Sequence, residues 1–209
     1  MQTNITDKLM NDTNIYVDIF GFGEMYEYLD ESLNVTGRFV CFTDKDPEKI
    51  EVYPGKSDKM ILGVSTIGLK TISDNPQEWP GKYLKNEFND AYVKMEPLAV
   101  GTKEYDDVNE RSFIMTRKAS KYSPIVSGEY DENQEYVNRL KRKQWGKVAL
   151  LGKAIITDNG KCKPGSFCTA YSGSKKELFG TAVPAKKDSA QKFYVISRYS
   201  DNTIKILLK

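Results

Sequence analysis

The sequence predicts a mainly β fold, a barrel-like or sandwich-like domain with a few short helices. Two observations carry this prediction. Apolar residues gather in short runs that are rich in β-branched and aromatic side chains, and clusters of turn residues separate these runs. No long stretch carries the 3.6-residue apolar period of an amphipathic helix, and no internal repeat is present. Short strands joined by turns are typical of all-β or mainly β architectures.

The length of 209 residues suits one domain with a sizeable core. The polar N-terminus lacks the apolar region of a secretory signal, so we expect a flexible arm over residues 1–15. We expect a single domain over residues 16–209. No run approaches the ~18 apolar residues of a membrane helix, which predicts no membrane association.

The N-terminal third holds four expected strands. A break at Gly21 and Gly23 indicates a bulge or bend in the first of them. Pro47 and its charged neighbours predict a turn between the second and the third. The expected strands lie within residues 15–29, 37–42, 49–53 and 60–68.

The middle of the chain is more polar and less regular. Two prolines predict a loop over residues 71–84, and strands are expected within 91–97 and 112–120. Residues 123–145 change from acidic to basic and predict a short helix or an ordered loop.

The C-terminal third carries the clearest strand pattern, the β-branched run of residues 147–157. Asn159-Gly160 follows as a strong hairpin-turn signal. Another strand is expected within residues 165–172, and a two-stranded hairpin is expected over 193–209 around Asp201-Asn202.

Composition excludes several kinds of chemistry. The chain has no histidine, which removes every Ser-His or Cys-His catalytic arrangement. Its three cysteines, Cys41, Cys162 and Cys168, are odd in number and lack a usual zinc spacing, so we expect free thiols. We expect no metal and no cofactor, and any acid–base chemistry would need carboxylates, lysine or tyrosine.

The segment GFGEMYEYLD, residues 21–30, places Glu24 and Glu27 among aromatic and apolar residues. A carboxylate in apolar surroundings resists ionisation, so its pKa rises, and it can then exchange protons near neutral pH. The alternative interpretation is a half-buried strand whose glutamates face water.

Charge is distributed unevenly along the chain. Residues 1–135 hold 15 lysines and arginines against 25 aspartates and glutamates, whereas residues 136–209 hold 16 against 4. Such asymmetry is typical of self-association or of an acidic partner such as nucleic acid. The alternative is that both halves interleave in one fold and their fields largely cancel. The candidate nucleic-acid-binding residues are Arg139, Lys141, Arg142 and Lys143.

Six segments follow one another in a recognisable order. They are GEMYEYLD (23–30), GRFV (37–40), ILGVST (61–66), WPGKYLKNEF (79–88), the run from 130 to 162, and YVISRYSDNTIKILLK (194–209). With these segments the chain resembles the autoprocessing intramolecular-chaperone domain, of glutamic-peptidase type, at the C-termini of phage neck-appendage and tailspike proteins. The resemblance covers most of residues 16–209.

The resemblance implies a β-rich homotrimer that guides the assembly of an upstream fibre and then cuts itself off. In that family, cleavage is attributed to an Asp and a Glu in the opening motif G-A-D-Y-A-E. Aligned with IFGFGE (19–24), the family Glu falls on Glu24 and the family Asp falls on Gly21. Asp18, three residues earlier, is a possible substitute for the missing carboxylate.

Three functions follow as hypotheses. The favoured one is a non-enzymatic, free-standing, trimeric viral protein with a structural or assembly role, in the virion or in the cytoplasm or nucleus of an infected cell. The second is a self-cleaving peptidase that uses Glu24 with Asp18 or Glu27. The third is a nucleic-acid-binding or chromatin-binding module formed by the basic C-terminal third.

Overall fold

The computed structural model describes most of the chain after the N-terminal segment. The described residues are 21–33, 35–56, 58–69, 71–76, 78–101, 103–106, 110–114 and 119–209. The expected arm over residues 1–15 lies outside them. The chain divides into two compact units, Met1–Asn75 with Val137–Lys209, here called the sheet unit, and Pro76–Tyr136, here called the hairpin unit. The single domain expected over 16–209 stays a prediction.

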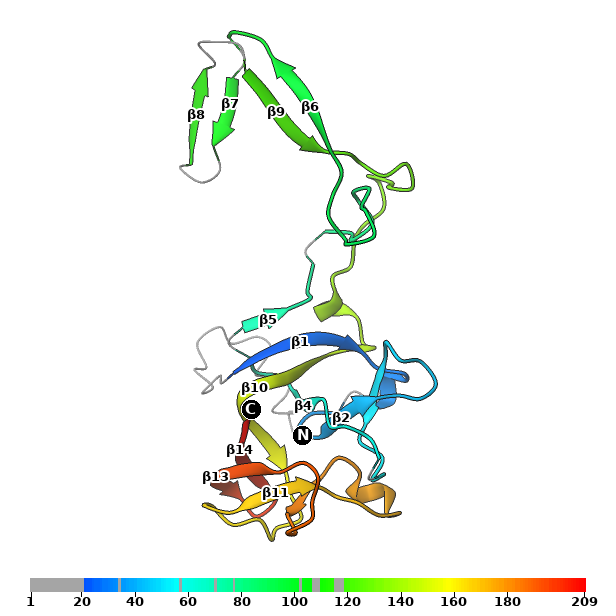
Figure 1. Cartoon of the computed structure of the whole chain (residues 1–209), viewed down its shortest axis with the longest axis vertical. Coiled ribbons are helices and arrows are strands. Elements are labelled where there is room, and N and C mark those ends of the chain that lie inside the picture. Colours follow the sequence, from blue (N-terminus) through cyan, green and yellow to red (C-terminus); the bar gives the residue numbers. More distant parts are fainter. Residues whose placement is uncertain are drawn as a thin grey trace, which may run out of the picture. The chain divides into compact units, whose positions relative to one another are not determined.

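The sheet unit is a curled, ten-stranded sheet that resembles half of a barrel (Figure 1). Its main strand order is β12-β11-β13-β14-β10-β4-β2-β3, and β1 and β5 pair beside β10. The strands are β1 (Phe22–Glu27), β2 (Phe39–Phe42), β3 (Ile50–Val52), β4 (Gly63–Thr66), β5 (Thr71–Ser73), β10 (Trp145–Thr157), β11 (Phe167–Ala170), β12 (Ala182–Pro184), β13 (Phe193–Ser200) and β14 (Thr203–Leu208). Three short 3₁₀ helices accompany them, η1 (Glu31–Leu33), η2 (Arg139–Lys141) and η3 (Lys176–Leu178).

The long strand β10 joins the two halves of this sheet. Its first half pairs with β1 and with β4, and its second half pairs with β14. The change of partner falls at Gly152, whose φ is +94°. Glycine adopts this backbone conformation without the steric cost that a side chain would add.

Two clusters of buried residues cover the two faces of the sheet around β2 and β10. Phe39 and Ala149 belong to the larger cluster, whereas their neighbours Val40 and Val148 belong to the smaller one. Successive residues of a strand point to opposite faces, so both faces are buried here. This burial on both sides explains why the runs GRFV and KVALL are almost continuously apolar.

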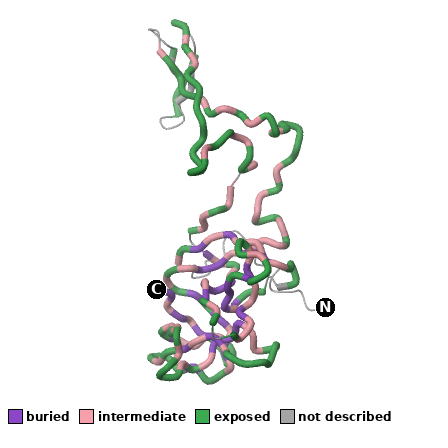
Figure 2. The backbone as a smooth tube through the Cα atoms, turned by 45° about the vertical axis from the view of Figure 1, so that its right-hand side comes forward, coloured by how far each residue is buried: buried purple, intermediate pink, exposed green. Residues whose placement is uncertain are grey.

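The described part of the hairpin unit includes two antiparallel strand pairs. Strand β6 (Val93–Leu98) pairs with β9 (Ala119–Pro124), and β7 (Lys103–Asp106) pairs with β8 (Arg111–Ile114). Of the residues in this unit whose burial the structure describes, none is buried. In Figure 2 the buried residues accordingly lie along the tube of the sheet unit.

Most expected strands of the described chain are confirmed. The strand expected within 112–120 corresponds to two strands, since β8 ends at Ile114 and β9 begins at Ala119, and no strand was expected at β7 or β12. Two further differences concern pairing. Residues 71–84 were expected as a loop, but Thr71–Ser73 form β5, which pairs in parallel with β1. Asn159-Gly160 forms a turn after β10, yet the next strand, β11, pairs with β12 and β13 and not with β10. The hairpin around Asp201-Asn202 is confirmed as β13 and β14. None of the described helices has the length and apolarity needed to cross a membrane.

Candidate carboxylate site on strand β1

Glu24 lies in the middle of β1, on the half-buried face of the strand. Its neighbours Gly23 and Met25 are buried, whereas Glu24 and Tyr26 are half-buried. This alternation is the ordinary pleat of a strand, which puts residues two apart on one face. Glu24 therefore faces the same side as Tyr26, and the parallel register sets it beside Ser73 of β5.

Both oxygens of the Glu24 carboxylate accept a hydrogen bond from a hydroxyl. Tyr26 Oη donates to Oε2 at 2.8 Å, and Ser73 Oγ donates to Oε1 at 2.9 Å. Two hydrogen bonds, one to each oxygen, hold the carboxylate in one orientation. The bonded partners of Glu24 in the described chain are two hydroxyls, and neither is a carboxylic acid.

Tyr26 stays protonated at neutral pH. Burial, the hydrogen bond to Glu24 and the nearby charges of Glu24 and Asp74 raise the pKa of Tyr26 to about 12. Its ring also packs edge-on against Phe42, with ring centroids 5.9 Å apart. Tyr26 therefore acts here as a fixed hydrogen-bond donor to Glu24.

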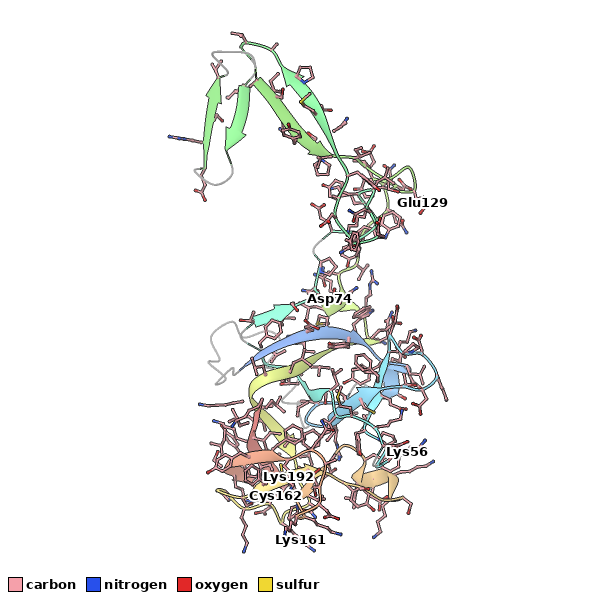
Figure 3. The ribbon with its side chains drawn as sticks, in the orientation of Figure 1. Lys56, Asp74, Glu129, Lys161, Cys162 and Lys192 are labelled. Atoms are coloured by element: carbon pink, nitrogen blue, oxygen red, sulfur yellow. The ribbon has the colours of Figure 1, made fainter. Side chains whose placement is uncertain are left out.

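Asp74, which follows Ser73, belongs to an ion pair. Arg139 of η2 pairs with the Asp74 carboxylate and donates from Nη1 to the Asp74 carbonyl at 2.7 Å. The same guanidinium lies 3.9 Å from the centroid of the Trp145 ring, a cation–π contact. Asp74 is labelled in Figure 3, at the end of β5. Its carboxylate is therefore paired with arginine.

Gly21, which the motif alignment predicts to take the place of the family aspartate, lies where two backbone segments approach closely. Its φ is +92°, and a Cβ atom placed on it would lie 2.4 Å from the carbonyl oxygen of Leu151. Gly152 faces it, since a Cβ on Gly152 would lie 2.9 Å from Gly21 Cα. An aspartate side chain at position 21 would require both an unfavourable φ and a shift of the backbone.

The two other carboxylates proposed from the sequence do not complete the site in the described residues. Glu27 forms an ion pair with Lys49, with Oε1 and Nζ 3.0 Å apart. Asp18 lies outside the described residues. The structure therefore brings Glu24 together with Ser73 and Tyr26, which the sequence interpretation had not singled out.

The four basic residues proposed for nucleic-acid binding differ in their surroundings. Lys141 and Lys143 are exposed, whereas Arg139 and Arg142 are half-buried. Arg139 is held by Asp74 and Trp145, and Arg142 Nε donates to the carbonyl of Val137 at 2.7 Å. The two arginines thus contribute to local packing around the start of β10.

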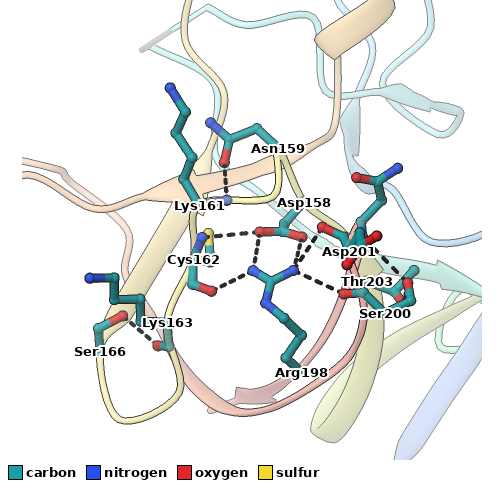
Figure 4. A network of polar contacts seen from close by, with 11 residues as sticks. Asp158, Asn159, Lys161, Cys162, Lys163, Ser166, Arg198, Ser200, Asp201 and Thr203 are labelled. Carbon is teal, nitrogen blue, oxygen red and sulfur yellow. Dashed lines mark hydrogen bonds and ion pairs between the residues drawn. The ribbon is translucent and has the colours of Figure 1, made fainter.

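A second polar cluster lies at the other end of β10 (Figure 4). The side chain of Asp158 is fully buried and receives two hydrogen bonds from Arg198 of β13, at 3.1 and 2.8 Å. The amide of Cys162 donates to the same carboxylate at 3.0 Å. Burial alone would raise the pKa of Asp158, but these bonds outweigh it and leave the pKa below its usual value.

Arg198 also binds the turn of the C-terminal hairpin. Its Nη1 donates to the carbonyls of Ser200 and Asp201 at 3.0 and 2.9 Å, and its Nη2 donates to the carbonyl of Cys162. The cluster therefore fastens the turn after β10 to the turn between β13 and β14. The Arg198 guanidinium and its carboxylate and carbonyl acceptors lie within hydrogen-bond distance of one another, so we interpret the cluster as a structural clamp.

The family of the chain follows from comparison with known proteins. Residues 5–200 match the Peptidase_G2 family, described as the IMC autoproteolytic cleavage domain. The chain belongs to this family. The resemblance found in the sequence is thereby confirmed.

Similar proteins come from Bacillus phages. The chain is 27% identical over 152 residues to the pre-neck appendage protein of Bacillus phage phi29. The aligned residues make up 73% of the chain but only 15% of that phage protein. The crystal structure of the C-terminal fragment of bacteriophage phi29 gene product 12 matches with a TM-score of 0.61 and 21% identity, over 90% of the chain and 99% of the fragment. The pre-mature form of that gene product matches with a TM-score of 0.63 and 21% identity, over 90% of the chain and 21% of that protein. These structures share the mainly β fold.

Proposed function

We propose that the chain is a non-enzymatic, trimeric assembly domain of a phage appendage, related to the intramolecular chaperones that cut themselves off. The family match and the similarity to pre-neck appendage proteins support a role in a virion. One observation supports the proposal that the chain does not cleave itself. Peptide hydrolysis by carboxylates needs one group to activate the nucleophile and another to protonate the leaving amine. By the motif alignment, Gly21 takes the place of the second carboxylate, and a Cβ atom there would lie 2.4 Å from the carbonyl oxygen of Leu151.

Intact mass and oligomeric state together test this proposal. The chain is produced with an N-terminal tag, so that loss of a segment of any size is visible, and its mass is followed during incubation. We expect the full-length mass to persist, and light scattering to give the mass of three chains. A stable monomer would remove the trimeric assembly role, and a shortened product would remove the non-enzymatic one.

The variants Gly21→Asp and Gly21→Ala sharpen the test. The first restores the family carboxylate, and the second adds only a Cβ, so it measures the steric cost alone. We expect both to lose stability by about 1–3 kcal/mol, because each places a side chain at a positive φ against Leu151. Neither variant is expected to produce cleavage.

A self-cleaving peptidase is the second candidate, and one contact favours it. Ser73 Oγ donates to Glu24 at 2.9 Å, so the carboxylate is positioned to take the hydroxyl proton as the oxygen attacks a peptide carbonyl. The same proton would then pass from Glu24 to the leaving amine, and water would release the acyl group from Ser73. If the tagged chain does shorten, Glu24→Gln and Ser73→Ala should each stop the reaction, whereas Ser73→Thr keeps a hydroxyl and should retain it in part.

Nucleic-acid binding through Arg139, Lys141, Arg142 and Lys143 remains the third hypothesis. Phosphate contacts by lysine and arginine weaken steeply with salt. A gel shift at low salt that disappears at physiological salt would support nonspecific binding through Lys141 and Lys143. No shift at either salt concentration would remove the hypothesis.

A further inference from the structure

Two of the three cysteines lie close together in the core of the sheet unit. Cys162 and Cys168 both belong to the larger buried cluster, with 1% and 0% of their surface exposed. Both are free thiols, as expected from the sequence. Their side chains share a hydrogen bond, which raises the pKa of Cys168 together with burial. The two sulfur atoms therefore contact each other.

A tight turn separates the two cysteines along the chain. Residues 163–166 read Lys-Pro-Gly-Ser, and Ser166 N donates to the Lys163 carbonyl at 3.2 Å. Gly165, the third residue of the turn, has a φ of +81°. Proline at the second position and glycine with positive φ at the third are typical of a type II turn. This local reversal of the chain explains how two residues so near in sequence come to share a contact in the core.

The backbone of each cysteine is held by a different set of partners. Cys162 N donates to the buried carboxylate of Asp158 at 3.0 Å, and the Cys162 carbonyl accepts from Arg198 (Figure 4). Cys168 lies in β11, between β12 and β13. The contact between the thiols is therefore a fixed feature of the fold, since the clamp positions one cysteine and the sheet positions the other.

The third cysteine gives the contrast. Cys41 lies in β2 and is buried in the same cluster, and burial raises its pKa to about 12. The other groups that act on this pKa are the charges of Lys59, Glu51 and Asp44, and none of them is a thiol. A buried cysteine alone serves as a small apolar side chain. Two thiols in contact can in addition be joined, because an S–S bond of about 2 Å needs only a small approach of the sulfur atoms.

We propose that Cys162 and Cys168 form a disulfide when the folded chain meets a small disulfide such as oxidised glutathione, and that this bond fastens the turn after β10 to β11. The inference goes beyond the proposed function. The proposed role in a virion supplies its setting, because thiols stay reduced in the cytosol and are oxidised at virion surfaces. The reaction itself depends neither on the number of chains in an assembly nor on self-cleavage.

The reaction is a thiol–disulfide exchange in two steps. The Cys162 thiol loses its proton, and the thiolate attacks one sulfur of oxidised glutathione, which breaks that S–S bond and releases a glutathione thiolate. The Cys168 thiolate then attacks the Cys162 sulfur of the mixed disulfide and releases the second glutathione. The two protons from the cysteines end on the two glutathione thiols. Two protein thiols are thus oxidised and one small disulfide is reduced.

The surroundings of the two cysteines set the order of attack. Cys162 lies outside the strands, between the exposed residues Lys161 and Lys163, whereas Cys168 is held within β11. A local opening of the turn therefore exposes Cys162 first, and Cys168 resolves the mixed disulfide. Buried thiols react slowly until such an opening occurs. We expect slow oxidation of the folded chain that follows the opening of this turn.

Intact mass and thiol counting test the bond. The reduced full chain is incubated with oxidised glutathione near neutral pH, and the remaining thiols are then alkylated in denaturant. We expect the loss of two hydrogen atoms and a decrease from three alkylated thiols to one. Digestion with trypsin should place the bond within one peptide, residues 162–175. Three alkylated thiols after prolonged incubation, or a bond that includes Cys41, would overturn the inference.

Single variants test the order of the two steps. Cys168→Ser lacks the resolving thiol and should accumulate one glutathione on Cys162, whereas Cys162→Ser should remain unmodified over the same period. Cys41→Ser is the matched control, because it also removes a buried thiol but should form the bond at the rate of the unmodified chain. Equal uptake of glutathione by Cys168→Ser and Cys162→Ser would contradict the proposed order, and loss of the bond in Cys41→Ser would contradict the pairing.

Thermal unfolding tests whether the bond fastens the turn. A disulfide stabilises a fold mainly by restricting the unfolded chain, so the oxidised sheet unit should melt about 5 °C above the reduced one. Addition of a reductant should restore the lower midpoint. The double variant Cys162→Ser with Cys168→Ser should melt at one temperature under both conditions. Equal midpoints for the oxidised and reduced forms of the unmodified chain would overturn the fastening role. These readouts are separate from light scattering and cleavage, so a failure here leaves the proposed function standing.

Discussion

Strands β14 and β6 both alternate between apolar and other residues, but the apolar side chains are buried in β14 and exposed in β6. In β14, Ile204, Ile206 and Leu208 point into the larger core cluster, whereas in β6 Val93 and Met95 are exposed. The first strand is covered by other elements of its own unit. The second belongs to a unit in which none of the residues whose burial is described is buried. Alternation thus identifies the face that requires cover, but it does not tell whether the same chain provides that cover.

The largest expected effect lies in the sheet unit, at Asp158. Asp158→Asn removes the charge opposite Arg198 and should cost about 3–5 kcal/mol, since the arginine is left without its buried partner. Thermal or denaturant unfolding measures this loss. A cost below about 1 kcal/mol would show that the clamp is not part of the stability of this unit.

The same carboxylate predicts a pH dependence of stability. The pKa of Asp158 is lowered in the folded state, so its contribution is complete above the unfolded value of about 4 and is lost as pH falls below it. Denaturant unfolding between pH 7 and pH 3 should therefore show a decrease in the free energy of unfolding that is smaller in Asp158→Asn. Parallel curves for the two proteins would contradict the assignment.

Substitution by alanine compares the two units directly. Ile206→Ala removes a fully buried side chain and should cost about 2–5 kcal/mol. Met95→Ala, measured in dilute monomer, should cost less than about 0.5 kcal/mol, because its side chain contacts water. Equal costs would indicate that Met95 is buried within the monomer and would end the contrast between the units.

The smallest expected effect concerns the hydrogen bonds of Glu24. Tyr26→Phe keeps the ring and removes the hydroxyl that donates to Glu24 at 2.8 Å, so it should cost about 1 kcal/mol. Ser73→Ala removes the other donor and serves as the matched variant. Chemical denaturation checks both values. A gain in stability in either variant would indicate that the carboxylate is better solvated without that donor.

The sequence predicted the fold class and most strands, because the signals for β10, β13 and β14 are local. The run of residues 147–157 is apolar and β-branched, and Asp201-Asn202 is a turn between two such runs. The strand β5 was missed because it is three residues long and depends on a parallel partner, β1, that lies far away in sequence. The turn at Asn159-Gly160 has a local sequence signal. That signal does not predict which strand pairs with the second half of β10, which is β14.

The candidate site could be predicted in part. Glu24 was found because it stands among aromatic residues and in a family motif. Ser73 and Asp74 were missed because they lie in a segment whose prolines predicted a loop, and their contact with Glu24 follows from the β1–β5 pairing. Asp158 has a local signal, its position directly before Asn159-Gly160, but its partner Arg198 is 40 residues away.

The crossing of Gly21 and Gly152 has a consequence for descent as well as for structure. A glycine codon and an aspartate codon can differ by one nucleotide, so the missing family carboxylate is genetically close. An aspartate there would meet a steric clash, because the Leu151 carbonyl oxygen occupies the space that its Cβ atom would need. An aspartate at position 21 would therefore lower stability before it restored any chemistry, because β10 must shift to admit its first carbon. In a lineage that changes one residue at a time, the carboxylate expected from the family motif could return only at this cost in stability.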